Sequence, residues 1–124
     1  MAKVITIFDH MGGVGKTTTV VNFASALAKL KKKVLVIDLD PQANATSGLG
    51  VDKDQEHNVY DLLIDKSEDV ILKTDYKNLD LIPSNGELAG IEIELSQEKN
   101  WQYRLKESIE NIKKNYDYCI IDSP

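Results

Sequence analysis

The sequence has almost no cysteine and no long apolar run. Its single cysteine, Cys119, rules out an intrachain disulfide, and a lone cysteine within an apolar segment is usually a small core residue of a protein kept in a reducing compartment. No apolar stretch approaches the roughly 20 residues that a membrane-spanning helix needs. The apolar start of the chain is too short for a signal peptide. We therefore expect a cytoplasmic protein with no contact to a membrane.

The chain also lacks an excess of positive charge. It carries 15 Lys and Arg against 20 Asp and Glu, which gives a formal net charge of −5. A protein that reads duplex DNA normally presents a basic face, because neutralised phosphates supply much of the affinity. The overall charge indicates no such face, although a local basic patch remains open. The lysines at 29 and 31–33 are interpreted as a solvated helix end rather than a nucleic-acid patch.

What is present is the composition of a globular domain. The 124 residues are 42% hydrophobic and 28% charged, which argues against a disordered or fibrous chain. A chain of this length can bury one hydrophobic core. The sequence shows no internal repeat, low-complexity tract or linker, so we expect a single domain over residues 1–124.

Apolar runs alternate with amphipathic segments along the chain. Strands are predicted at residues 4–8, 34–37, 79–82 and 118–121. The runs at 4–8, 34–37 and 118–121 indicate buried strands, the first buried on both faces. Helices are predicted at residues 16–30, 59–64, 68–72, 87–95 and 101–114, and a mobile loop at residues 41–50. This alternation predicts an α/β fold, with a parallel sheet, helices on both of its faces and right-handed crossovers.

Two of the predicted helices carry an apolar stripe at three- and four-residue spacing. We interpret both stripes as faces that pack on the core. The members are Val20, Phe23, Ala24, Leu27 and Leu30 in the first helix, and Trp101, Leu105, Ile109 and Ile112 in the last.

A glycine-rich turn joins the first predicted strand to the first helix. Its glycines are Gly12, Gly13 and Gly15. Such a turn aims backbone N–H groups and a helix N-terminus at phosphate, and glycine permits the close approach. Lys16 could reach the β- and γ-phosphates, and the Thr17 hydroxyl could bind Mg²⁺. His10 stands where the general P-loop pattern has its first glycine, so the strict motif is not met. The alternative is a turn that only links strand to helix.

This turn and two later segments resemble the ParA/Soj family of partition ATPases, P-loop NTPases that are related to MinD. Residues 11–18 correspond to the family's deviant Walker A motif, K-G-G-x-G-K-[ST]-[ST]. Residues 38–42 match its D-x-D-P-Q segment, and residues 118–124 match its Walker B strand and the start of the next switch. The three motifs occur in the family's order, and D-x-D-P-Q favours ParA/Soj over MinD.

The resemblance implies ATP and Mg²⁺ as cofactors and hydrolysis to ADP and phosphate. Lys16 and Asp40 would be the catalytic residues, with Asp40 orienting the attacking water. Thr17, Asp38 and Asp122 would serve the metal, the last through a water molecule. The implied ATP-binding residues are Met11, Gly12, Gly13, Val14, Gly15, Lys16, Thr17 and Thr18. The alternative role for each aspartate is that of a turn residue or helix cap, and we favour it more for Asp38 than for the other two.

The sequence departs from the family in two ways. Met11 replaces the signature lysine, which reaches across a dimer to the partner's nucleotide. A comparable missing cation, the arginine finger, changes the rate by about 10³ to 10⁵, so we expect impaired hydrolysis. The chain also stops directly after the Walker B strand, whereas family members continue for a comparable length. It is expected to be a fragment, a truncated form or a shortened natural protein.

The resemblance implies an ATP-dependent switch that forms a nucleotide-dependent homodimer. It would act in chromosome or plasmid partitioning with a ParB-like partner and non-specific DNA, at the nucleoid of a bacterial or archaeal cell. Two alternatives remain open. One is a module that binds nucleotide with little or no hydrolysis, which Met11 motivates. The other is a MinD-like positioning ATPase.

Overall fold

The computed structural model describes residues 2–7, 14–52, 54–55, 57–65, 69–84 and 101–123. The helices are α1 (Val14–Lys29), α2 (Asn44–Gly48), α3 (Val59–Asp65), α5 (Trp101–Ile112) and the 3₁₀ helix η1 (Lys113–Asn115). The strands are β1 (Lys3–Ile7), β2 (Val34–Asp38), β3 (Leu72–Lys73), β4 (Leu79–Ile82) and β5 (Tyr118–Asp122). None of the described helices is long and apolar enough to cross a bilayer.

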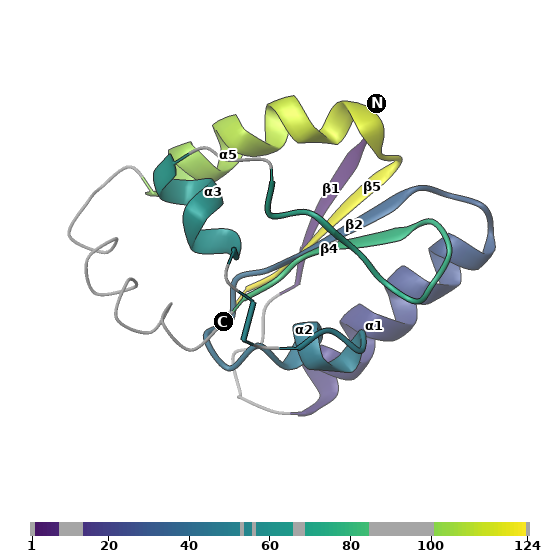
Figure 1. The fold of residues 1–124 in the computed structure, drawn as a ribbon. Coiled ribbons are helices and arrows are strands. Elements are labelled where there is room, and N and C mark those ends of the chain that lie inside the picture. Colours follow the sequence, from purple (N-terminus) through teal and green to yellow (C-terminus); the bar gives the residue numbers. More distant parts are fainter. Residues whose placement is uncertain are drawn as a thin grey trace.

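The strands form one mostly parallel sheet in the order β1-β5-β2-β4-β3 (Figure 1). β1, β5, β2 and β4 run parallel, and the short β3 pairs antiparallel with β4. In this register Asp38 at the end of β2 lies beside Asp122 at the end of β5. The predicted α/β fold with a parallel sheet is therefore confirmed, with one antiparallel edge strand added.

Helices cover both faces of the sheet and produce three layers (Figure 1). Along β2 successive side chains alternate between two cores, because strand side chains point to opposite faces. Val34 and Val36 pack toward α1 and α2. Leu35 and Ile37 pack toward α3 and α5. This double burial explains the uninterrupted apolar run of β2.

Cys119 on β5 lies in the core on the α3 and α5 side and is fully buried. Burial raises the pKa of its thiol to about 11. The expectation of a core cysteine is confirmed.

The prediction that the first strand is buried on both faces is wrong. The residues of β1 are exposed or half-buried, and Val4 is 45% exposed. The reason is position: in the described sheet β1 pairs with β5 alone, at the edge of the order. An apolar β-branched run thus occurs in both central and edge strands, so this pattern does not show which kind of strand it forms.

Helix α1 begins two residues earlier than predicted and ends one earlier. Val20 and Ala24 of the expected stripe are buried, but Phe23 and Leu30 are 40% and 71% exposed, so their assignment to the core is wrong. The helix ends at Lys29, and Lys31, two residues further on, has a left-handed φ of 66°.

Two other predictions are wrong because longer-range contacts override local composition. Residues 41–50 are not a mobile loop, since they contain α2, with Ala45 and Thr46 fully buried. The helix expected at residues 68–72 is not formed: Asp69 and Val70 lie in a turn, and Leu72 begins β3. The helix expected at residues 87–95 and the side chain of Trp101 lie outside the described residues. The helices expected at residues 59–64 and 101–114 are confirmed as α3 and α5, although α5 ends at Ile112 and η1 follows it.

Candidate functional site

Charged side chains gather at the carboxyl edge of the sheet. Asp38 and Asp122 end two neighbouring strands, and Asp40 follows two residues after β2. Lys16 is the third residue of α1, and its side chain reaches the same edge. Ligands of open α/β sheets bind outside the carboxyl ends of the strands, so this is the candidate site. Of the predicted phosphate loop, Met11, Gly12 and Gly13 lie outside the described residues, as does the side chain of Val14.

The ammonium group of Lys16 has three oxygen neighbours. Its Nζ lies 2.9 Å from Asp40 Oδ2 and 2.8 Å from Asp122 Oδ1. It also donates a 2.9 Å hydrogen bond to the carbonyl oxygen of Ser123. The Lys16 side chain is only 6% exposed, and that of Asp122 is fully buried. Residues far apart in the sequence therefore form one compact cluster with a single shared cation.

Burial and charge pairing act against each other in this cluster. Burial alone would lower the pKa of Lys16, but its bonds to Asp122 and Asp40 outweigh burial and raise it above the ordinary value. Burial raises the pKa of Asp122, and the nearby ammonium offsets only part of that shift. Lys16 is therefore charged in the folded chain, and it is the main group that stabilises the buried carboxylate.

Asp122 also has an oxygen that no donor satisfies. Its Oδ2 is buried and has no hydrogen-bond partner among the described residues. A buried carboxylate oxygen left unpaired is unfavourable, and a divalent cation or its water shell would satisfy it. The described residues hold no group of three or more His, Cys, Asp or Glu side chains that could bind a metal alone. This donor set fits Mg²⁺, which usually keeps waters and binds through one or two carboxylates together with phosphate.

Asp38 points into a different set of contacts. Its Oδ2 accepts the N–H and the hydroxyl of Thr46 at 2.9 and 2.7 Å, and its Oδ1 accepts the N–H of Asp40 at 3.0 Å. Burial raises the pKa of Asp38 to about 6, although these three donors lower it in part. Both oxygens are thus occupied in anchoring α2 and the turn that carries Asp40.

Sequence reasoning missed two residues of this network, Thr46 and Ser84. Ser84, next to Pro83 beyond β4, donates its hydroxyl to the carbonyl oxygen of Asp40 at 2.6 Å. Its N–H donates to Thr46 Oγ1 at 3.1 Å. The available signal was position: a polar residue that follows a parallel strand lies at the carboxyl edge, as Asp38 and Asp122 do.

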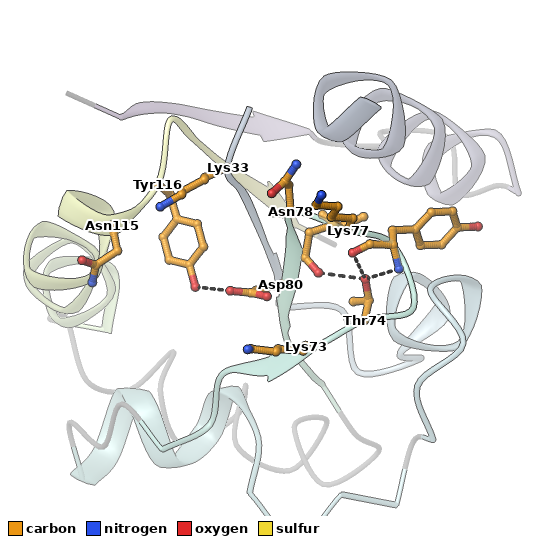
Figure 2. A pocket seen from close by; sticks show the side chains of 10 residues that line it. Lys33, Lys73, Thr74, Lys77, Asn78, Asp80, Asn115 and Tyr116 are labelled. Carbon is orange, nitrogen blue, oxygen red and sulfur yellow. Dashed lines mark hydrogen bonds between the residues drawn. The ribbon is translucent and has the colours of Figure 1, made fainter. Parts of the chain in front are cut away.

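A polar hollow lies at the opposite, amino edge of the sheet (Figure 2). Its volume is about 470 Å³, and its lining includes Lys33, Lys73 and Lys77. Asp80 lies among them and accepts a 2.7 Å hydrogen bond from the Tyr116 hydroxyl. Burial and this hydrogen bond raise the pKa of Tyr116. None of the predicted site residues lines this hollow, so the carboxyl edge remains the candidate site.

Comparison with known proteins agrees with this geometry. The AAA_31 family model, described as an AAA domain, matches residues 2–124, and the chain belongs to this family.

Within the family, the chain is similar to partition proteins. The sporulation initiation inhibitor protein Soj of Bacillus subtilis is 52% identical over 127 aligned residues, which cover all of this chain and 50% of Soj. The chromosome partitioning protein ParA of Caulobacter vibrioides is 42% identical, with 98% of this chain and 48% of that protein covered. The chain thus spans about half the length of the relatives it matches, and the expected ParA/Soj resemblance is confirmed.

A solved structure shows the same fold with ligands. The cobyrinic acid a,c-diamide synthase of Mycobacterium smegmatis, with bound ADP and magnesium, superposes with a TM-score of 0.92 at 35% identity. The match covers all of this chain and 51% of that one. The same synthase was also solved with an ATP analogue and magnesium. One fold can serve different reactions, so the fold alone does not identify the reaction.

Proposed function

We propose that this chain is a nucleotide-binding domain over residues 1–124 that binds ATP with Mg²⁺ and serves an ATP-hydrolysing switch of the ParA/Soj type. The observation that carries the proposal is the Lys16 ammonium between Asp40 and Asp122. A cation at the start of a helix, next to two carboxylates at the carboxyl edge of a parallel sheet, suits a triphosphate and its metal. The similarity to Soj and ParA supports the partition type.

In this proposal each side chain has one task. Lys16 exchanges its carboxylate neighbours for phosphate oxygens and neutralises their charge. Thr17 would offer its hydroxyl to Mg²⁺, and the unpaired oxygen of Asp122 would hold the ion through a water molecule. The ion would neutralise charge on the phosphates. Asp40, released by Lys16, orients the attacking water. Asp38 supports the metal site indirectly, by holding the turn that carries Asp40. The remaining phosphate contacts are assigned to residues 11–15 and Thr18.

Isothermal titration calorimetry tests this proposal. ATP with Mg²⁺ is titrated into the chain, the Lys16→Ala variant and the Lys32→Ala variant, which removes an exposed lysine beyond the far end of α1. We expect Lys16→Ala to weaken ATP binding at least tenfold and Lys32→Ala to leave it unchanged. Equal affinity in all three proteins would contradict the assignment of the site.

A second candidate function is nucleotide binding with little or no turnover. Met11, where the family has a lysine that reaches the partner's nucleotide, favours it, because methionine cannot neutralise developing phosphoryl charge. In the complete protein, where such a lysine can reach the partner's nucleotide, Met11→Lys should then raise the ATPase rate by orders of magnitude while ATP affinity changes little. An unchanged rate would show that Met11 does not limit hydrolysis, and ATPase activity of the unaltered chain at a rate typical of the family would exclude this second function.

For the complete protein we propose a nucleotide-dependent homodimer in the bacterial or archaeal cytoplasm. A ParB-like partner and non-specific DNA at the nucleoid follow from the partition type. Sedimentation with ATP, with ADP and without nucleotide tests the dimer, and we expect the mass to double with ATP alone.

A further inference from the structure

A closed ring of hydrogen bonds holds the backbone of Asp40 from both sides. Its N–H donates to Asp38 Oδ1 at 3.0 Å, and its carbonyl accepts from Ser84 Oγ at 2.6 Å. Ser84 N–H donates to Thr46 Oγ1 at 3.1 Å, and that hydroxyl donates to Asp38 Oδ2 at 2.7 Å. The ring connects the end of β2, the following turn, α2 and the segment after β4.

Three of the four residues of the ring are shielded from water, and Asp40 is half-buried. Asp38, Thr46 and Ser84 are each fully buried. A buried hydrogen bond is strong, and losing one partner leaves the other unsatisfied, because water cannot replace it. The Asp40 carbonyl also accepts the N–H of Ala43 at 2.9 Å, which closes the local turn. Among the described residues, Ser84 alone ties that carbonyl to β4.

The side chain of Asp40 extends from the ring toward the cation. Its Oδ1 accepts the N–H of Gln42 at 3.0 Å, and its Oδ2 lies 2.9 Å from Lys16 Nζ. The ring therefore fixes the backbone of Asp40 and leaves its carboxylate outside the ring, at the Lys16 ammonium. A shift of the turn away from Ser84 would carry this carboxylate away from Lys16.

We propose that Ser84 is a positioning residue of the nucleotide site, which acts by holding the Asp40 backbone so that the carboxylate lies at the Lys16 ammonium. The effect of Ser84 on catalysis rests on the proposed function. Its effect on the position of Asp40 can be measured in the chain without nucleotide. In catalysis, loss of the Ser84 hydroxyl should lower turnover more than ATP affinity, because Lys16 still binds phosphate while Asp40 is less well placed.

The experiment measures how fast the protons of the Lys16 ammonium exchange with water, by nitrogen-15 NMR of the nucleotide-free chain. A shielded ammonium with three acceptors exchanges its protons slowly, and Lys16→Met identifies its signal. We expect Ser84→Ala to speed this exchange roughly three- to tenfold, and to speed amide exchange over residues 40–46 by a similar factor. Ser108→Ala, which changes a buried serine of α5, is the matched control and should alter neither.

A second variant covers the case in which Ser84→Ala does not fold. Thr46→Val keeps the volume of residue 46 but removes both hydrogen bonds of its hydroxyl, so it opens the same ring. Thermal unfolding confirms that each variant is folded. An unchanged ammonium signal in a folded Ser84→Ala or Thr46→Val variant would overturn the proposal.

ATP titration and turnover then separate this inference from the proposed function. For Ser84→Ala we expect ATP affinity within threefold of the original chain and kcat lowered about tenfold, with Ser108→Ala normal in both. Equal losses in affinity and turnover would overturn the positioning role and leave a purely structural one. If the original chain binds no ATP, the proposed function fails, and the ammonium signal still decides whether Ser84 places Asp40.

Discussion

Gly15 shows, at the scale of one residue, how a requirement of the fold differs from a requirement of a ligand. A Cβ built on Gly15 would meet nothing within 4 Å among the described residues, so that part of the structure leaves room for a side chain there. A Cβ on Gly48 would lie 3.0 Å from Val21 Cγ2, where α2 rests on α1. The two glycines should therefore respond to alanine in opposite ways.

We predict that Gly15→Ala lowers ATP affinity at least tenfold without lowering the unfolding free energy. The methyl group would stand where phosphate approaches, while alanine is favoured over glycine in a helix by about 0.5–1 kcal/mol. Gly48→Ala should instead lower the unfolding free energy by about 1 kcal/mol, because overpacking against Val21 outweighs the same helix preference. Calorimetry and urea unfolding measure the two quantities. Normal ATP binding by Gly15→Ala would contradict a phosphate site at this position.

Asp38 makes stability depend on pH. Its pKa of about 6 in the folded chain lies above the ordinary 3.8, so the folded chain holds this proton more tightly than the unfolded one. The stabilising contribution is thus complete below about pH 4 and is lost as the pH rises to about 6. At 1.36 kcal/mol per pH unit, the lost contribution is roughly 3 kcal/mol.

We predict that Asp38→Asn removes this dependence. Urea unfolding of the original chain and the variant, compared at about pH 4.5 and pH 7, should show the original chain relatively more stable at the lower pH. Asp52→Asn, at an exposed carboxyl group, controls for removal of a charge. A difference between original chain and variant that is constant with pH would show that ionisation of Asp38 does not affect folding.

At the scale of elements, α1 ends in a Schellman motif. Lys31 N–H donates to Ala28 O and Lys32 N–H donates to Leu27 O, at 3.0 and 3.2 Å. Lys31 occupies the left-handed position that glycine normally fills. We predict that Lys31→Gly raises the unfolding free energy by about 1 kcal/mol, because glycine adopts this φ without steric cost. Thermal unfolding measures the gain. Lys32→Gly, one residue beyond, should give none, and an equal gain there would refute the explanation.

The elements also show what the sequence could and could not predict. β2 and β5 were predictable, because a short apolar run with no polar interruption indicates a strand buried on both faces. Lys16, Asp40 and Asp122 could be placed together because Asp40 follows β2 and Asp122 ends β5, both at motif positions on the same side of the sheet as the start of α1. α2 could not be predicted, since its polar residues favour a loop and its anchor, Asp38, is a tertiary contact. The hydrogen-bonded ring through Ser84 was not predictable for the same reason. The two-residue strand β3 is too short to show an alternating pattern.

At the scale of the whole molecule, the sheet has a centre and edges of unequal protection. β2 pairs with both β4 and β5, and its residues are all buried, whereas β1 pairs with β5 alone and is partly exposed. We predict that backbone amides of β2 and β5 exchange with solvent slowest and those of β1 at least tenfold faster, because local opening at an edge breaks fewer contacts. Native-state hydrogen exchange tests this. Equal protection of β1 and β2 would contradict it.

The burial of the chain's single thiol has a practical consequence. The thiolate is the form that reacts with maleimides. The Cys119 thiol is fully buried, and burial raises its pKa, so little thiolate forms and reagents do not reach it. A substitution such as Lys77→Cys, at the exposed rim of the hollow in Figure 2, would therefore introduce the sole reactive group for a fluorophore. A five-residue strand places the amino edge of the sheet roughly 16 Å from its carboxyl edge. Such a dye could report on assembly without a cysteine-free background and without touching the carboxylates at the opposite edge.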